Sequence, residues 1–174
     1  AEENFKVSLL TYSSVRKWRE DKNFGFKVIR IWKKVPWFFR HFFFIFKAFS
    51  QAKRHDLVYS LSTLNGGISG LLSAGFFKKP FLIRIVGDYA WQTAVLRGKT
   101  NLSIDDFQKS KKKGWVSFLF RVQSFVCRRA DRVVVPSEYI SRLVQGWGVS
   151  KEKISMIYNG SDFRPALFSK EEAR

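Results

Sequence analysis

Short apolar segments rich in β-branched and aromatic residues alternate along this chain with stretches of helical periodicity. Strands separated by helices pair in parallel, in a sheet covered by helices on both faces. The alternation therefore predicts a Rossmann-like α/β fold, in one domain over residues 1–174, a length that buries a single core. Six strands are expected, at Phe5–Tyr12, Phe26–Ile31, Asp56–Leu61, Pro80–Val86, Asp131–Val135 and Lys153–Tyr158.

Helical patterns fill the intervals between these strands. Ser137 has the side chain of an N-cap, and Glu138 would lie in the first turn of the helix that follows. The apolar spacing from Trp115 to Val126 is typical of a helix packed against a sheet. Small residues dominate Asn65–Phe77, which predicts a helix lying close to a strand. The lysine-rich segment Arg97–Gly114 predicts an exposed loop with one short turn.

The chain carries a formal net charge of +18, from 32 Lys and Arg against 14 Asp and Glu. This charge favours an anionic partner, whether a lipid surface, a nucleic acid or a phosphorylated substrate. Cys127 is the single cysteine, so no disulfide within the chain is possible and a reducing cytoplasmic setting is expected. The longest apolar run, Phe42–Phe46, is far shorter than the roughly 20 residues that span a bilayer. No targeting segment is expected.

Ligands of open α/β sheets bind beyond the carboxyl ends of the strands. The segments that follow the predicted strands are polar or rich in glycine, as a binding site requires. The candidate substrate-binding residues in these segments are Ser13, Asn65, Gly66, Gly67, Gly87, Tyr89, Trp91, Ser137, Asn159 and Gly160, with Asp88 as the candidate catalytic residue.

Known cofactor and metal motifs do not fit this sequence. The segment Asn65–Gly70 is neither a dinucleotide-binding G-x-G-x-x-G loop nor a phosphate-binding loop ending in Gly-Lys-Ser/Thr. His41, His55 and Cys127 have no spacing suited to zinc. We therefore predict no nicotinamide cofactor and no metal.

The last third of the chain carries a more specific pattern. Residues Arg128–Tyr139 and Gly148–Gly160 are similar to the pattern "ADxVxxxS … GVxxxKIxVIxNGVD" of glycosyltransferase family 4. Upstream, His55–Tyr59 and Lys79–Trp91 resemble the two preceding strands of that family, including a "VGDYAW" variant. The resemblance extends from about Phe5 to Asp162 and identifies the chain as similar to the N-terminal, acceptor-side domain of a GT-B enzyme.

This resemblance implies a parent enzyme that transfers a sugar from a nucleotide-sugar donor to a glycan, lipid or small-molecule acceptor, with retention of configuration and without a metal. The family's first strand and its glycine-rich loop would precede Phe5, and the donor-binding domain with its E-x7-E motif would follow Asp162. Neither is in this sequence. The stretch alone is therefore expected to transfer no sugar and to need the donor-binding domain as a partner.

Two of the candidate sites have a structural interpretation beside the functional one. Asp88 occupies the place where many family members carry a catalytic His or Asp, but it can equally cap a helix beginning at Tyr89. Gly66 and Gly67 can admit an acceptor close to the backbone, although tight packing of a small-residue helix is the favoured explanation.

The segment Trp37–Gln51 predicts an amphipathic helix. Phe38, Phe42, Ile45 and Phe49 form one face, and Phe44 falls among the opposite polar residues Arg40, Lys47 and Gln51. A Phe exposed beside basic residues suits a helix lying on anionic lipid, with Lys111, Lys112 and Lys113 as further contacts at the inner face of a cytoplasmic membrane. The alternatives are an ordinary core helix, a nucleic-acid-binding module, which lacks any reader motif, and a non-catalytic sugar- or lipid-binding module.

Overall fold

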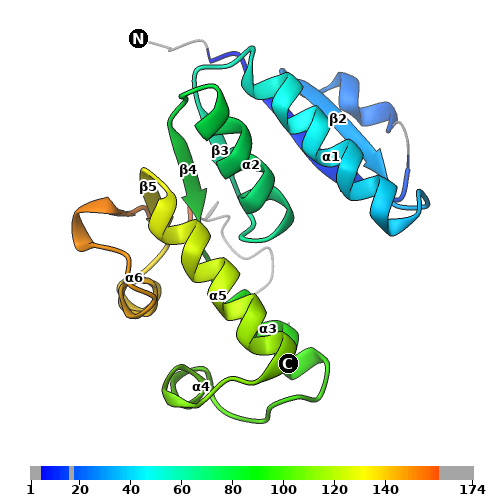
Figure 1. Ribbon diagram of the computed structural model, residues 1–174. Helices are drawn as coiled ribbons and strands as arrows, with labels where there is room; N and C mark the ends of the chain where they lie inside the picture. The colour runs from blue at the N-terminus through cyan, green and yellow to red at the C-terminus, as the bar shows by residue number, and fades with distance from the viewer. Residues whose placement is uncertain (1–4, 16–17, 161–174) are drawn as a thin grey trace, which may run out of the picture.

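A computed structural model describes residues 5–15 and 18–160 and has the predicted α/β fold (Figure 1). All six predicted strands are confirmed: β1 Ser8–Ser13, β2 Lys27–Trp32, β3 Val58–Ser60, β4 Phe81–Arg84, β5 Arg132–Val135 and β6 Ile154–Met156. The helices are α1 Trp37–Ala52, α2 Asn65–Phe76, α3 Tyr89–Leu96, α4 Ile104–Lys109, α5 Gly114–Arg129 and α6 Glu138–Gly146, with single 3-10 turns at Arg19–Lys22 and Lys151–Lys153.

The strands form two parallel sheets, whereas the sequence predicted one. β1 pairs with β2 over the full length of both strands, from Ser8 opposite Lys27 to Ser13 opposite Trp32. β3, β4, β5 and β6 form the second sheet in chain order. Strand pairing depends on contacts between distant parts of the chain, so the local pattern that locates each strand does not show which strands are neighbours.

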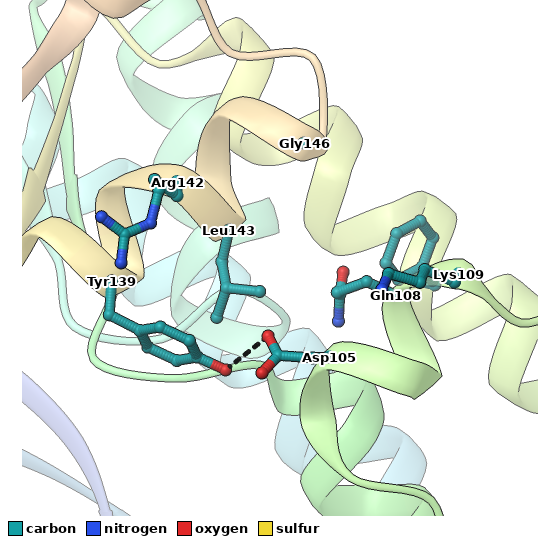
Figure 2. Close-up of a pocket in the computed structure, with 8 residues that line it drawn as sticks. Asp105, Gln108, Lys109, Tyr139, Arg142, Leu143 and Gly146 are labelled. Carbon is teal, nitrogen blue, oxygen red and sulfur yellow. Dashed lines mark hydrogen bonds between the residues drawn. The ribbon is translucent and has the colours of Figure 1, made fainter.

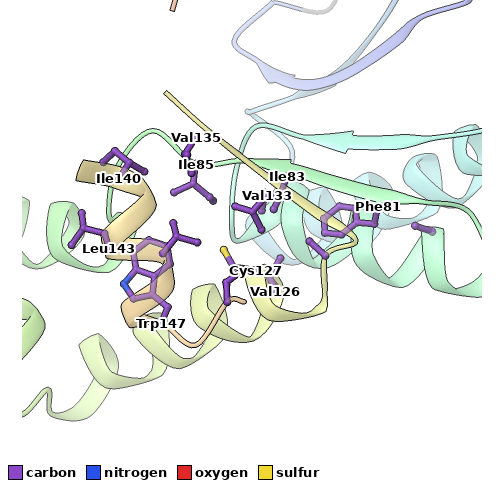
Figure 3. Close-up of a cluster of buried hydrophobic side chains, with 14 residues drawn as sticks. Phe81, Ile83, Ile85, Val126, Cys127, Val133, Val135, Ile140, Leu143 and Trp147 are labelled. Atoms are coloured by element: carbon purple, nitrogen blue, oxygen red, sulfur yellow. The ribbon is translucent and has the colours of Figure 1, made fainter. Parts of the chain in front are cut away.

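The main core lies between the four-stranded sheet and three helices. Alternate residues along β4 point to the same face, where Phe81, Ile83 and, directly after the strand, Ile85 are buried. Ala74 of α2, Cys127 of α5 and residues of α6 complete this cluster (Figure 3). The helices α2, α5 and α6 therefore cover a common face of the sheet. A second, smaller cluster joins α3, α4 and α5 through Ala90, Phe107 and Leu119.

Close packing of α2 explains its glycines. A Cβ atom on Gly70 would lie 2.7 Å from the Phe81 ring, and one on Gly67 would lie 2.7 Å from the carbonyl oxygen of Ser62 and 3.1 Å from Val126. All three distances are below normal van der Waals contact. The predicted close approach of this helix to a strand is thus confirmed, and it requires residues without a side chain.

The helix α1 is oriented opposite to the expectation for a membrane-facing Phe44. Phe44 is buried, with 7% of its surface exposed, and its ring centroid lies 4.7 Å from that of Tyr12 on β1. Arg40 also faces inward, because its guanidinium lies over the Tyr12 ring and donates to the carbonyl oxygen of Lys33. The prediction that Phe44 is exposed is wrong: the polar side of α1 faces β1 and β2, and the phenylalanine-rich side faces outward.

Among the residues that the structure describes, no helix combines the length and apolar character needed to cross a bilayer.

Candidate functional site

Three helices begin at the carboxyl ends of strands in the four-stranded sheet, and α1 follows β2 of the other sheet. α2 follows β3, α3 follows β4 and α6 follows β5, each after a short polar segment. Ser137 caps α6, as predicted, with its hydroxyl oxygen accepting from the amide of Ile140 at 3.3 Å. At the N-terminus of α2 the N-cap residue Leu64 makes no side-chain hydrogen bond, and the hydroxyl oxygen of Ser62 accepts from the amide of Gly66 at 3.3 Å. Partial positive charge at helix N-termini makes this edge suited to anionic or oxygen-rich ligands.

Asp88 is the most highly connected side chain at this edge. One carboxylate oxygen accepts from the amide of Trp91 and from the side chain of Gln123, both at 2.9 Å. The other oxygen accepts from the side chain of Gln108 at 2.7 Å. Gln123 in turn accepts from the amide of Ala90. The hydrogen bond from the amide of Trp91 confirms that Asp88 caps α3. The carboxylate is fully buried, and its catalytic role stays a prediction.

The hydrogen bonds continue from Asp88 to the end of α6. Gln108 of α4 accepts from the indole nitrogen of Trp147 at 3.0 Å. Neither Gln108 nor Gln123 was selected from the sequence, because a buried glutamine has no local pattern to reveal it. The network connects the start of α3 to Gln108 of α4 and to Gln123 of α5, and through Gln108 to Trp147 after α6. These hydrogen bonds hold the four helices in fixed positions relative to one another.

Cys127 lies near this network in the core. Burial raises the pKa of its thiol to about 12, and the negative charge of Asp88 adds to the shift. A thiol with so high a pKa is protonated at neutral pH and is a poor nucleophile. Cys127 is therefore a core residue rather than a reactive one.

Asn159 is held at the same edge by a residue that the sequence did not single out. Its side-chain oxygen accepts from the guanidinium of Arg84 at 2.7 Å, across β5, which lies between β4 and β6. Gly160 follows and is exposed. The pair brings a cation and a polar amide to the carboxyl ends of the strands. A basic residue within an otherwise apolar predicted strand, Pro80–Val86, was the available signal for Arg84.

The predicted glycine-rich contacts lie around the start of α2. Asn65 is the exposed first residue of this helix. A Cβ atom on Gly66 would lie 2.8 Å from the hydroxyl oxygen of Ser60, and Gly67 is buried against the helix layer. The packing explanation for both glycines is thus supported by their surroundings, and only Asn65 presents a side chain to solvent here.

The remaining candidates serve different roles. Tyr89 is exposed at the start of α3, whereas the indole of Trp91 donates to the carbonyl oxygen of Leu102 and packs in the smaller core. A Cβ atom on Gly87 would lie 2.8 Å from the side-chain amide of Gln92. Ser13 is buried in the other sheet, where it accepts from Arg30. Tyr89 is therefore the side chain of this group best placed to meet a ligand.

A pocket of about 430 Å³ opens between α4 and α6 (Figure 2). Tyr139 donates to the carboxylate of Asp105 at 3.0 Å across its mouth. Partial desolvation, with the Asp105 hydrogen bond, raises the pKa of Tyr139. Gln108 also lines this pocket, which connects it to the Asp88 network. The sequence did not predict the pocket, because Asp105 and Tyr139 are far apart along the chain.

The lysines of the segment 109–113 are not equivalent. Lys111 and Lys113 are exposed, as a surface contact requires. Lys112 instead folds back, donates to three carbonyl oxygens and lies over the rings of Phe107 and Phe120. Desolvation lowers the pKa of Lys112, although Asp88 opposes the shift. The prediction that Lys112 reaches a membrane is wrong, because its ammonium group donates to the carbonyl oxygens at the C-terminus of α4.

Within residues 5–15 and 18–160, no group of three His, Cys, Asp or Glu side chains comes close enough to hold a metal ion. The absence of a metal from the reaction stays a prediction.

The sequence model of Glycosyltransferase Family 4 matches residues 1–164. A search of curated proteins finds no match to this sequence. Among solved structures, the chain is similar to HepE of Anabaena in complex with UDP, at 15% identity and a TM-score of 0.55, over 91% of this chain and 45% of HepE. The complexes of HepE with UDP and glucose (16% identity, TM-score 0.56, 88% of this chain and 45% of HepE) and with UDP-glucose (15%, 0.55, 89% and 44%) are equally similar. The chain thus spans less than half the length of these neighbours.

Proposed function

Because the chain belongs to glycosyltransferase family 4, we propose that it supplies the acceptor-side half of a GT-B enzyme. This enzyme transfers a sugar from a nucleotide-sugar donor to a glycan, lipid or small-molecule acceptor, with retention of configuration. The donor is held by a separate donor-binding domain, and this half requires no cofactor of its own. We place the enzyme in the cytoplasm.

The arrangement at the carboxyl ends of the strands carries this proposal. Three helix N-termini converge on one edge, where Asn65, Tyr89 and the Arg84–Asn159 pair present polar groups to solvent. Such groups bind the hydroxyl oxygens of an acceptor by hydrogen bonds. The exposed N-terminus of α2 also offers favourable electrostatics for a phosphate group that approaches from a facing domain.

The buried hydrogen-bond network around Asp88 holds the helix that carries Tyr89 in place. It ties the start of α3 to Gln123 in the second half of α5, so Tyr89 is presented from a rigid support. Precise placement of binding groups is what positions two substrates for reaction. We assign Asp88 to this positioning task, with direct contact to the transferred sugar as the alternative role.

The donor is proposed from the structural neighbours. HepE binds UDP and UDP-glucose, and this chain corresponds to less than half of HepE. A uridine-diphosphate sugar is therefore the first donor to test. If the donor site lies in the other half, calorimetry of the isolated chain with UDP-glucose gives no binding heat. Micromolar binding of UDP-glucose by the isolated chain would contradict the proposal that the donor site lies in a separate domain.

The acceptor role is tested in the enzyme encoded by the complete reading frame. Asn65→Ala removes an exposed amide that makes no contact needed for the fold, and we expect kcat/KM to fall about threefold to tenfold, the value of one lost hydrogen bond. Asn23→Ala, also exposed but next to β2, is the matched control and leaves kcat/KM unchanged. Equal activity of the wild type and the Asn65 variant would remove this edge from the acceptor site.

A further inference from the structure

The outward face of α1 is almost entirely aromatic. Phe39, Phe42, Phe43 and Phe46 follow helical spacing and are all exposed, with Phe42 and Phe46 at 62% and 60% of their surface. Phe38, at the start of the helix, is more exposed still. This surface is not needed for the core, because Phe44 on the opposite side makes the contact with β1. A contiguous apolar patch of this kind marks an interaction site.

The two neighbouring helices extend the patch. α2 lies between α1 and α5 (Figure 1) and joins α1 through ring contacts of Phe49 with Phe76 and Phe77. The outward stripe of α2 is Ile68, Leu72 and Phe76, which are all exposed and are four residues apart. On α5, Trp115, Phe118 and Phe125 are exposed aromatic residues as well. We call the outward side of α1, α2 and α5 the aromatic face.

The charge on this face has a single sign. The three helices contain no Asp or Glu, although the chain has 14 acidic residues. The basic side chains belong to α1 and α5, where Lys47, Arg121, Arg128 and Arg129 are exposed; Arg128 turns toward α6 and donates to the carbonyl oxygen of Trp147. Exposed lysines and arginines also follow the helices, at Lys53, Arg54 and Lys78. The aromatic face is therefore apolar at its centre, positive around it and free of negative charge over the helices that form it.

We propose that the aromatic face docks on the surface of an anionic lipid bilayer, with α1, α2 and α5 lying in the interface. Phenylalanine rings enter the boundary between head groups and acyl chains, while lysines and arginines meet the phosphates. Each basic residue near an anionic surface adds attraction that falls with salt. A protein interface would share the aromatic centre, but its partner would have to bring acidic residues to meet each part of the basic rim, whereas an anionic bilayer offers negative charge over its whole surface.

This docking differs in its residues from the one predicted by the sequence. Phe44, Arg40 and Lys112 are turned inward, and the phenylalanines of the opposite side of α1 take their place. Because α2 begins at the carboxyl ends of the strands, the bilayer would lie beside the edge where Asn65 is exposed. The docking surface itself does not depend on the proposed enzymatic function.

The test is co-sedimentation of the full chain with vesicles. We expect binding to phosphatidylcholine–phosphatidylglycerol vesicles, weaker binding at high salt, and little binding to phosphatidylcholine alone. The double variant Phe42→Ser, Phe46→Ser should bind about 100-fold more weakly, at about tenfold for each ring withdrawn from the interface. Arg121→Gln should bind about fivefold more weakly. Melting temperatures should stay close to wild type, since all three side chains are exposed.

The control is Leu96→Ser, which makes the same kind of change at an 86% exposed residue of α3, outside the aromatic face. Its vesicle binding should equal that of the wild type. Equal binding by the double phenylalanine variant and the wild type would overturn the proposal, as would equal binding to neutral and anionic vesicles. Binding to single-stranded DNA but not to vesicles would assign the basic charge to a nucleic acid instead. Since no nucleotide sugar is present, failure here leaves the proposed glycosyl transfer untouched.

Discussion

Replacing Asp88 by Asn tests the hydrogen-bond network in the smallest possible step. The substitution keeps the size of the side chain and leaves one oxygen to cap α3 by accepting from Trp91. It also converts the second oxygen, which accepts from Gln108, into a nitrogen that can only donate. Gln108 cannot rotate its amide to compensate, because its own oxygen already accepts from Trp147. Two donors would then face each other.

The expected loss of stability follows from these contacts. A hydrogen bond to a charged group contributes about 1.5–3 kcal/mol, and Gln108 is only half-buried, so solvent offsets part of its loss. We expect Asp88→Asn to lower the free energy of unfolding by about 2 kcal/mol. Asp88→Ala also removes the cap, worth about 1 kcal/mol, and leaves the buried amide of Gln123 without its acceptor, at about 1–3 kcal/mol. Together these losses amount to about 4–6 kcal/mol for Asp88→Ala.

Urea unfolding followed by circular dichroism at neutral pH measures both variants. Asp105→Asn is the matched control, because the same chemical change at an exposed carboxylate should cost less than about 0.5 kcal/mol. A loss below about 0.5 kcal/mol for Asp88→Asn would refute the reasoning, since it would mean that Gln108 gains nothing from the second oxygen. In the complete enzyme, lost activity with unchanged stability would instead favour the catalytic role.

Three further results are expected. Phe44→Ser should lower the free energy of unfolding by about 4 kcal/mol in urea unfolding, because it leaves a cavity and a buried hydroxyl, and a loss under about 1 kcal/mol would contradict the burial of this ring. Cys127 should resist thiol reagents at pH 8 until the chain unfolds, since its pKa is raised to about 12; rapid labelling of the native protein would show the thiol to be accessible. Burial and the neighbouring Arg40 lower the pKa of His41 below 6.5, so the folded state binds fewer protons than the unfolded state. The free energy of unfolding should therefore fall as the pH drops below about 6.5. Urea unfolding measured across this pH range should show that His41→Gln removes this dependence.

Local chemistry accounts for what the sequence predicted well. The strands are short runs of apolar residues between polar segments, and the caps at Asp88 and Ser137 depend only on side chains three residues from the amides they bind. These signals lie within one turn or one strand. The close approach of α2 to a strand was equally predictable, because a run of small residues along a helix favours close packing.

Long-range contacts account for what the sequence missed. The periodicity of α1 shows two faces but not which one meets the strands, and here the ring of Tyr12 selects the side of Phe44 and Arg40. The network of Gln108 and Gln123 joins residues 20 and 35 positions away from Asp88. Lys112 looks like a surface charge until the carbonyls at the end of α4 are seen to surround it.

The division of the strands into two sheets has a consequence for handling the protein in solution. In the part of the chain that the structure describes, β1, β2, β3 and β6 each have one side without a neighbouring strand, twice the number of edges of a single sheet. β2 contains Lys27 and Arg30, whereas β1, β3 and β6 contain no charged residue, and of these three only β6 directly follows a charged turn, Lys151–Lys153. Charge on an edge strand opposes pairing between molecules. Aggregation of the isolated chain should therefore begin at β1 and β3, and lysine substitutions along these two edges are the changes most suited to keeping concentrated samples monomeric.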